Sequence, residues 1–239
     1  RLILLDEIAG GLTEGECHEL VATIRQIHAE GTAIIWIEHV LHALNSVVER
    51  LMVLNFGKML MIGKPDEVIT PVTYINSAAD LKAFCGEHGG IVCTSTNAPV
   101  ILDWAFSRRE KVLFFPDQHL GRWTGFKKGI PLDAMVVWDP DLEYGGLTPE
   151  QIRSAKILLW KGHCSVHQMF QPVHIDRWRE KHPHGFVISH PESMLEVCQK
   201  SDYVGSTEFI LNTITQAPPN THWLVGTELN LVSRLAEEM

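Results

Sequence analysis

The sequence predicts an α/β fold built on parallel sheets, and two observations support that prediction. Short apolar runs recur along the 239 residues, and most of them are continuous rather than alternating, which is typical of strands buried on both faces. Amphipathic stretches separate most of these runs, so strand and helix signals follow one another along the chain. This order favours parallel strands joined by crossover helices.

The first elements are ordered as strand, helix and strand. The apolar run 2–5 predicts a buried strand, and an amphipathic pattern predicts a long helix from about Glu14 to Ala29. Gly31 follows this helix, as glycine commonly does just past a helix C-terminus. A second strand, AIIWIEH, begins at Ala33. We expect the two strands to be parallel and covered on both faces.

The segment from Pro65 to Val72 holds two prolines and little periodicity, and it is predicted to be a linker. Farther along, the sequence Thr148-Pro149-Glu150 predicts a helix start, because it combines a capping hydroxyl, a proline in the first turn and an acid. Apolar runs predict further strands at about residues 90–93, 111–115, 134–138, 156–160, 186–189 and 222–225.

Charge and composition exclude some classes of partner. The formal charge of −9 argues against nucleic acid or an anionic membrane as partner, because both need clustered Lys and Arg. No apolar run approaches the roughly 20 residues that span a bilayer, and RLILLDE lacks the features of a signal peptide, so we expect a cytoplasmic protein without membrane insertion. The cysteines are odd in number and widely spaced, which suits reduced thiols or a metal ligand.

An apolar strand followed by Asp6 and Glu7 forms a Walker B arrangement, in which the Asp binds magnesium and the next carboxylate polarises the attacking water. With His39 after the next strand and the stretch LMVLNFGKMLMIGKPDEVI, residues 1–70 resemble the C-terminal part of branched-chain amino-acid ABC transporter ATPases. The resemblance implies that His39 is a switch histidine. The sequence contains no G-x-x-x-x-G-K-[ST] phosphate loop, so this partial P-loop-ATPase-like α/β segment is expected to be vestigial.

Polar residues gather where the later strands end. They lie in the segments TYINS, CTSTNA, FPDQHLGR, WKGHCSVHQ, ISHPES and DYVGSTEF. Each could be explained singly by helix capping or by a surface histidine. Ligands of parallel sheets, however, collect beyond the carboxyl ends of the strands, so the six segments together indicate one small-molecule site.

These segments resemble quinolinate synthase over about residues 73–239. The resemblance implies three-layer parallel-sheet domains, with residues 71–167 as a second domain and residues 168–239 as a truncated third, after the ATPase-like residues 1–70. It also implies a cytoplasmic enzyme that condenses iminoaspartate with dihydroxyacetone phosphate to quinolinate in NAD biosynthesis. Many neutral donors suit a dianionic substrate and a phosphate.

The same resemblance assigns roles to individual residues. Glu192 and Tyr74 are expected to transfer protons, while His190 and His167 polarise the substrate. The substrate-binding residues implied are Tyr74, Asn76, Ser95, His167, His190, Glu192, Ser206 and Thr207.

The family's 4Fe-4S cluster is held by three cysteines, and Cys164 matches one of them. A second belongs to the first third of the family's chain, and the third follows the segment Gly226-Thr227-Glu228. The resemblance therefore implies that this chain alone is inactive. Two alternatives stay open, namely an ABC transporter ATP-binding subunit and a non-catalytic small-molecule-binding α/β module. The sequence sets no expectation for the oligomeric state.

Overall fold

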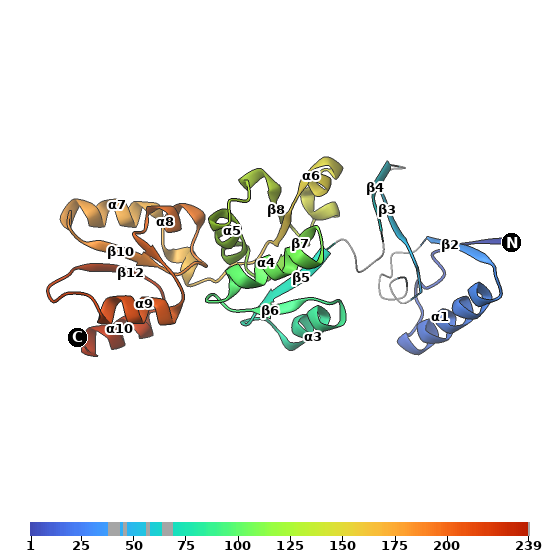
Figure 1. The fold of residues 1–239 in the computed structure, drawn as a ribbon, viewed down its shortest axis with the longest axis horizontal. Coiled ribbons are helices and arrows are strands. Elements are labelled where there is room, and N and C mark those ends of the chain that lie inside the picture. The colour runs from blue at the N-terminus through green and yellow to red at the C-terminus, as the bar shows by residue number, and fades with distance from the viewer. Residues whose placement is uncertain (38–43, 45–46, 56–57, 64–68, 239) are drawn as a thin grey trace. The chain divides into compact units, whose positions relative to one another are not determined.

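A computed structural model describes the chain apart from residues 38–43, 45–46, 56–57, 64–68 and 239 (Figure 1). The chain divides into two compact units, residues 1–68 and residues 69–239. Sheets of parallel strands joined through helices occur in both, so the predicted α/β class with parallel sheets is confirmed. No helix of the described ranges is long and apolar enough to cross a membrane.

The first unit contains a parallel pair of strands and an antiparallel pair. Its elements are β1 (Leu2–Asp6), α1 (Glu14–Ala29), β2 (Ala33–Ile37), β3 (Leu51–Asn55) and β4 (Lys58–Gly63). The predicted helix is confirmed, and a capping box explains its start. Thr13 Oγ1 accepts from the Glu16 N–H at 3.4 Å, and Glu16 Oε2 accepts from the Thr13 N–H at 2.8 Å. Gly31 follows with a φ of 87°.

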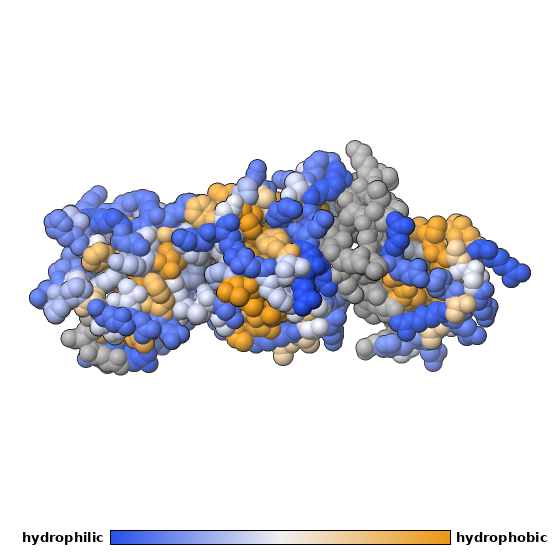
Figure 2. Space-filling view, in the orientation of Figure 1, coloured by the Kyte–Doolittle hydropathy of each residue, from blue (hydrophilic) through white to orange (hydrophobic). Residues whose placement is uncertain are grey.

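The expectation that β1 and β2 are covered on both faces is wrong for the described residues. One face packs on α1, where Cys17 and Val21 are buried with Trp36 against them. The other face is open, because Leu4 is 70% exposed and Ile37 is 59% exposed. Figure 2 shows hydrophobic residues gathered on the surface of this unit. Side chains alternate between the faces of a strand, so continuous apolar runs here leave every second residue in solvent.

The second unit begins with a five-stranded parallel sheet in the order β6-β5-β7-β9-β8. Its strands are β5 (Ile69–Tyr74), β6 (Ile91–Cys93), β7 (Lys111–Phe115), β8 (Met135–Trp138) and β9 (Ile157–Trp160). The connections contain α3 (Ala79–Glu87), α4 (Ala98–Arg108), α5 (Gln118–Lys127), α6 (Pro149–Ser154) and the 3-10 turns η1 (Leu132–Ala134) and η2 (Glu143–Gly146). The helix start predicted at Thr148 is confirmed by a capping box with Gln151.

The predicted linker extends too far, because the structure places its last four residues in β5. Pro71 suggested a break, since proline cannot donate to a strand ladder. In the sheet, however, the pairing of β5 with β6 begins only at Val72, so Pro71 has a ladder partner on the β7 side alone. Thr70 and Val72, on either side of it, are fully buried.

A second sheet of three parallel strands has the order β11-β10-β12. Helices cover both of its faces (Figure 1), because Val187 packs in one cluster with Ile175 and Val197, and Ile188 packs in another with Ile210. Its elements are β10 (Phe186–Ser189), β11 (Tyr203–Val204), β12 (Trp223–Gly226), α7 (Pro172–Lys181), α8 (Leu195–Lys200), α9 (Thr207–Thr215) and α10 (Leu229–Glu238), and the 3-10 turn η3 (His167–Met169) precedes them.

Candidate active site

The strand orders place the candidate site where ligands bind to parallel sheets. In the first sheet of the second unit, β6 lies on one side of β5 and β7 lies on the other side. In the second sheet, β11 lies on one side of β10 and β12 lies on the other side. Crevices open at the carboxyl ends of strands where the order reverses in this manner. Tyr74 ends β5, Asp117 follows β7, and His190 follows β10.

A carboxylate between two imidazoles forms the centre of the site. Glu192 Oε2 lies 3.2 Å from His190 Nδ1 and 3.4 Å from His167 Nδ1. The two imidazole rings stack with their centroids 4.5 Å apart. All three side chains are buried, and Glu192 is only 6% exposed. Such a buried anion requires partners, and the two histidines supply them.

The hydrogen bonds of the two histidines define their roles. His190 Nδ1 faces the Glu192 carboxylate at 3.2 Å and the Glu192 backbone N–H at 3.4 Å. Nδ1 can donate to the carboxylate only if it carries the ring proton. The contact of Nδ1 with the carboxylate is shorter than its contact with the backbone N–H, and the carboxylate is charged, so we assign the proton to Nδ1. His167 Nε2 lies 3.4 Å from Thr227 Oγ1, and His167 Nδ1 lies 3.4 Å from Glu192 Oε2, so each ring nitrogen of His167 faces a polar partner.

The environment keeps Glu192 ionised. Burial raises the pKa of this carboxyl, but the hydrogen bonds and charges of His167 and His190 together outweigh that effect and hold the pKa at about 2. At neutral pH Glu192 is thus a proton acceptor. Its position between two donors also orients its oxygens.

Tyr74 has the opposite character. Burial, followed by the negative charge of Glu192, raises the pKa of the Tyr74 phenol above its usual value, and hydrogen bonding with Ser95 offsets only part of that rise. The phenol is 5% exposed and stays protonated at neutral pH. Tyr74 is therefore a proton donor at the end of β5, near the carboxylate acceptor that follows β10.

Cys164 joins this group from the turn after β9. Its Sγ, a ring nitrogen of His167 and a carboxylate oxygen of Glu192 all lie within 4.8 Å of one another. Thiolate, imidazole and carboxylate are metal-ligating groups, and Cys164 is partly exposed. Burial raises the pKa of Cys85 to about 11 and that of Cys93 and Cys198 to about 12, so these cysteines remain thiols. Cys164 alone among these four is partly exposed, and it lies beside other potential metal ligands.

The other predicted substrate-binding residues differ in their exposure. Asn76 is exposed just past β5. Ser206 is buried and caps α9 by accepting from the Phe209 N–H at 3.3 Å, and the neighbouring Thr207 is exposed. Ser206 lies at the same sheet edge as His190, because the Gly205 N–H donates to Ser189 at the end of β10.

In the first unit, Asp6 and Glu7 are both exposed at the end of β1. The Glu7 N–H donates to the Ile37 carbonyl at 2.8 Å, which extends the ladder between β1 and β2 by one bond. His39 lies outside the described residues. The predicted nucleotide-site residues are therefore placed only in part.

Sequence reasoning assigned no role to Asp117 or Thr227, although both follow strands. Asp117 is 3% exposed, and its Oδ2 accepts from the Cys164 N–H at 2.9 Å. Burial raises its pKa to about 7. The sequence signal for both residues is their position in the segments FPDQHLGR and GTE, because polar residues just after a strand lie at the carboxyl edge of the sheet.

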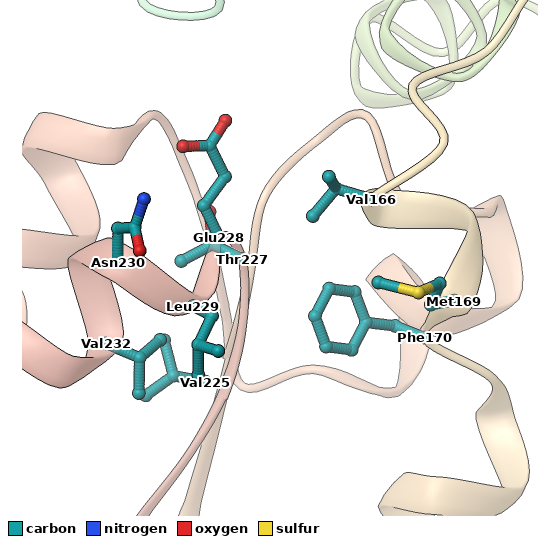
Figure 3. A pocket seen from close by; sticks show the side chains of 9 residues that line it. All are labelled: Val166, Met169, Phe170, Val225, Thr227, Glu228, Leu229, Asn230 and Val232. Atoms are coloured by element: carbon teal, nitrogen blue, oxygen red, sulfur yellow. The ribbon is translucent and has the colours of Figure 1, made fainter.

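A pocket of about 600 Å³ adjoins this group, and Thr227 connects the two because it lines the pocket and contacts His167. Figure 3 shows apolar side chains from η3 on one side and from β12 and α10 on the other, with the Glu228 carboxylate pointing away from Val225. The volume suits a small organic molecule. The lining residues are Val166, Met169, Phe170, Val225, Thr227, Glu228, Leu229, Asn230 and Val232.

We expect His119 to make stability depend on pH. Burial, followed by the charges of Arg122 and His163, lowers its pKa from 6.5 to about 4. The folded protein keeps this ring neutral, whereas the unfolded chain binds a proton below 6.5, so stability from the neutral ring is complete above pH 6.5 and is lost as pH falls toward 4.

Replacing His119 by Gln should remove about 2 kcal/mol of this pH dependence, a value reduced for solvent screening of a partly exposed ring. Urea unfolding at pH values on either side of this window measures the difference. The matched control is His184→Gln, at an exposed position, which should leave the dependence intact. An identical pH dependence in His119→Gln and the original chain would contradict the assignment.

Parallel sheets with a buried carboxylate, two imidazoles, a phenol and a thiol at their carboxyl ends define the class of an α/β protein with a group of side chains that could hold a metal ion. The chain belongs to the quinolinate synthetase A protein (NadA) family, whose model matches residues 41–239. This match begins before the start expected at about residue 73, so it includes residues 41–70, which were interpreted as ATPase-like.

Curated relatives agree with the family assignment. The chain is 58% identical over 176 residues to the quinolinate synthase of Herpetosiphon aurantiacus, covering 73% of this chain and 47% of the relative. It is 57% identical over 173 residues to that of Rhodopirellula baltica, covering 72% and 44%. For the Acidobacterium capsulatum enzyme the identity is 55% over 179 residues, covering 75% and 48%. The matched part thus spans slightly less than half the length of these relatives.

Proposed function

We propose that this chain forms part of a quinolinate synthase, which condenses iminoaspartate with dihydroxyacetone phosphate to quinolinate in NAD biosynthesis. One observation carries the proposal beyond family membership, namely the buried Glu192 carboxylate between His167 and His190. Condensation followed by dehydration needs an acceptor and a donor for protons close together. The ionised Glu192 and the protonated Tyr74 supply this pair.

Each side chain has a proposed task. Glu192 removes a proton from the substrate carbon or nitrogen, and Tyr74 returns a proton to a departing oxygen. His167 and His190 donate hydrogen bonds that polarise a carbonyl. Neutral donors hold the carboxylates and the phosphate, and we assign Asn76, Ser95, Ser206 and Thr207 to them.

The proposal includes a 4Fe-4S cluster with Cys164 as one ligand. When bound, such a cluster supplies an open iron that acts as a Lewis acid. The support on this chain is the position of the Cys164 thiol beside His167 and Glu192. We further propose residues 71–167 and 168–239 as the second and third domains of the enzyme.

Iron content and product formation test this proposal in the complete gene product after anaerobic reconstitution. Cys164→Ala should lose cluster absorption and quinolinate formation, whereas Cys17→Ala, in the first unit, should keep both. Quinolinate formation that survives Cys164→Ala would refute the role of the thiol. A protein that binds iminoaspartate yet never gains iron would favour the alternative, a non-catalytic small-molecule-binding module.

A second proposal concerns the predicted ATPase-like residues 1–70, of which residues 1–40 precede the family match; we interpret residues 1–40 as an ABC-ATPase-like segment. Its support is the parallel pairing of β1 with β2, with Asp6 at the end of β1 as in a Walker B strand. Because the sequence lacks a phosphate loop, we expect the chain to hydrolyse no ATP. ATP turnover that disappears in Glu7→Gln would show instead that this segment is an active nucleotide site.

A further inference from the structure

Asp117 links the first turn of α5 to the turn that carries Cys164. Its Oδ1 accepts from the Leu120 N–H at 2.7 Å, which caps α5, and its Oδ2 accepts from the Cys164 N–H at 2.9 Å. The side chain is 3% exposed. Burial excludes water that would compete for these two hydrogen bonds.

The backbones of the same two turns lie in direct contact. The Gln118 N–H donates to the Gly162 carbonyl at 3.0 Å. A Cβ atom at Gly162 would lie 2.1 Å from the Pro116 carbonyl oxygen, so only glycine fits this close approach. Three contacts therefore hold the turn after β9 against the turn after β7. They are a backbone hydrogen bond, a close backbone approach and the hydrogen bond to the Asp117 carboxylate.

We propose that Asp117 is a positioning residue, which fixes the turn of Cys164 so that its thiol faces His167 and Glu192. The inference rests on the proposed function, in which Cys164 ligates a cluster. A helix cap alone would need a single acceptor oxygen, as a serine provides. Both oxygens of Asp117 are used, and the second bonds a residue 47 positions away.

The decisive variant is Asp117→Ser, because a serine hydroxyl can still cap α5 and is too short to reach Cys164 as well. Labelling the chain with ¹⁵N-cysteine gives one backbone amide signal for each of the five cysteines. The variant Cys164→Ser identifies the signal of Cys164.

In Asp117→Ser the Cys164 amide should exchange its hydrogen about tenfold faster or more, in line with the loss of a buried hydrogen bond. The amides of Cys85, Cys93 and Cys198 should exchange as before. Asp117→Asn has one acceptor oxygen for two amides and should give an intermediate rate, which provides a second variant if the serine variant folds poorly. Thr148→Ala removes the cap of α6 and serves as the matched control, with an unchanged Cys164 amide.

The second measurement uses the complete gene product with reconstituted iron. A chelator should remove iron about tenfold faster from Asp117→Ser than from the original protein, while Thr148→Ala loses iron at the original rate. An unchanged Cys164 amide in both Asp117 variants would overturn the inference. So would faster amide exchange combined with unchanged iron loss, because Asp117 would then hold the turn without positioning the thiol. If the original protein binds no iron at all, the cluster part of the proposed function fails, and the amide exchange decides the role of Asp117 by itself.

Discussion

Replacing Glu192 by Gln is expected to lower the rate of quinolinate formation about a thousandfold, the middle of the range for removal of a general base. Glutamine keeps the size of the side chain and an acceptor oxygen for His190, but it cannot take up a proton. Since the native carboxylate is 6% exposed and lies against two imidazoles, solvent cannot easily replace it.

The rate is measured in the complete, iron-loaded gene product, with circular dichroism as a check on folding. The control Glu180→Gln makes the same chemical change at an exposed position of α7 and should leave the rate unchanged. If Glu192→Gln retains more than about a tenth of the original rate, then Glu192 is not the general base. Another group near Tyr74 would then have to accept the proton.

Truncating Phe114 to Ala is expected to destabilise the second unit by about 4 kcal/mol. Phe114 is fully buried in β7, inside the core cluster with Val72, Leu102 and Leu120. Helix α5 lies so close to it that a Cβ atom at Gly121 would approach the Phe114 ring to 2.7 Å. Such tight packing leaves little freedom for the neighbours to fill the cavity.

Native-state hydrogen exchange reports on this unit separately, through the amides of β7 and β9, whose protection should fall about a thousandfold. Val100→Ala, at a position of α4 that is 69% exposed, should change the same amides by no more than about twofold. If protection of the β7 and β9 amides falls by less than tenfold in Phe114→Ala, the core must rearrange to fill the space of the missing ring.

Local sequence patterns predicted most of the secondary structure, and their failures have local causes. The strands at 111–115 and 186–189 match β7 and β10, because each is a continuous apolar run bounded by polar residues. Strand β5 was missed because Pro71 interrupts its pattern, and β11 is only two residues long. The open face of β1 and β2 could not be predicted, because a continuous apolar run does not reveal which of its faces is covered.

The candidate site was predicted through resemblance more than through physical pattern. The structure brings Glu192, His190, His167 and Cys164 together, whereas it leaves Asn76 exposed past β5. Asp117 had no assigned role, because its bond to Cys164 crosses 47 positions and no local periodicity encodes such a contact. Polar residues after strands indicate the carboxyl edge of a sheet, but which of these residues contact one another depends on the tertiary structure.

The long separations inside the site also affect when it can form. The contact of His167 with Thr227 spans 60 positions, whereas the turns and caps around it join residues only a few positions apart. Contacts between distant residues form late, because closing a long loop costs conformational entropy before any contact rewards it. A chain emerging from the ribosome can therefore complete its five-stranded sheet before Thr227 is available to contact His167. Under the proposed role of Cys164, iron delivered at that stage would meet a thiol without its neighbours, so metal loading is expected to follow synthesis of β12 rather than accompany it.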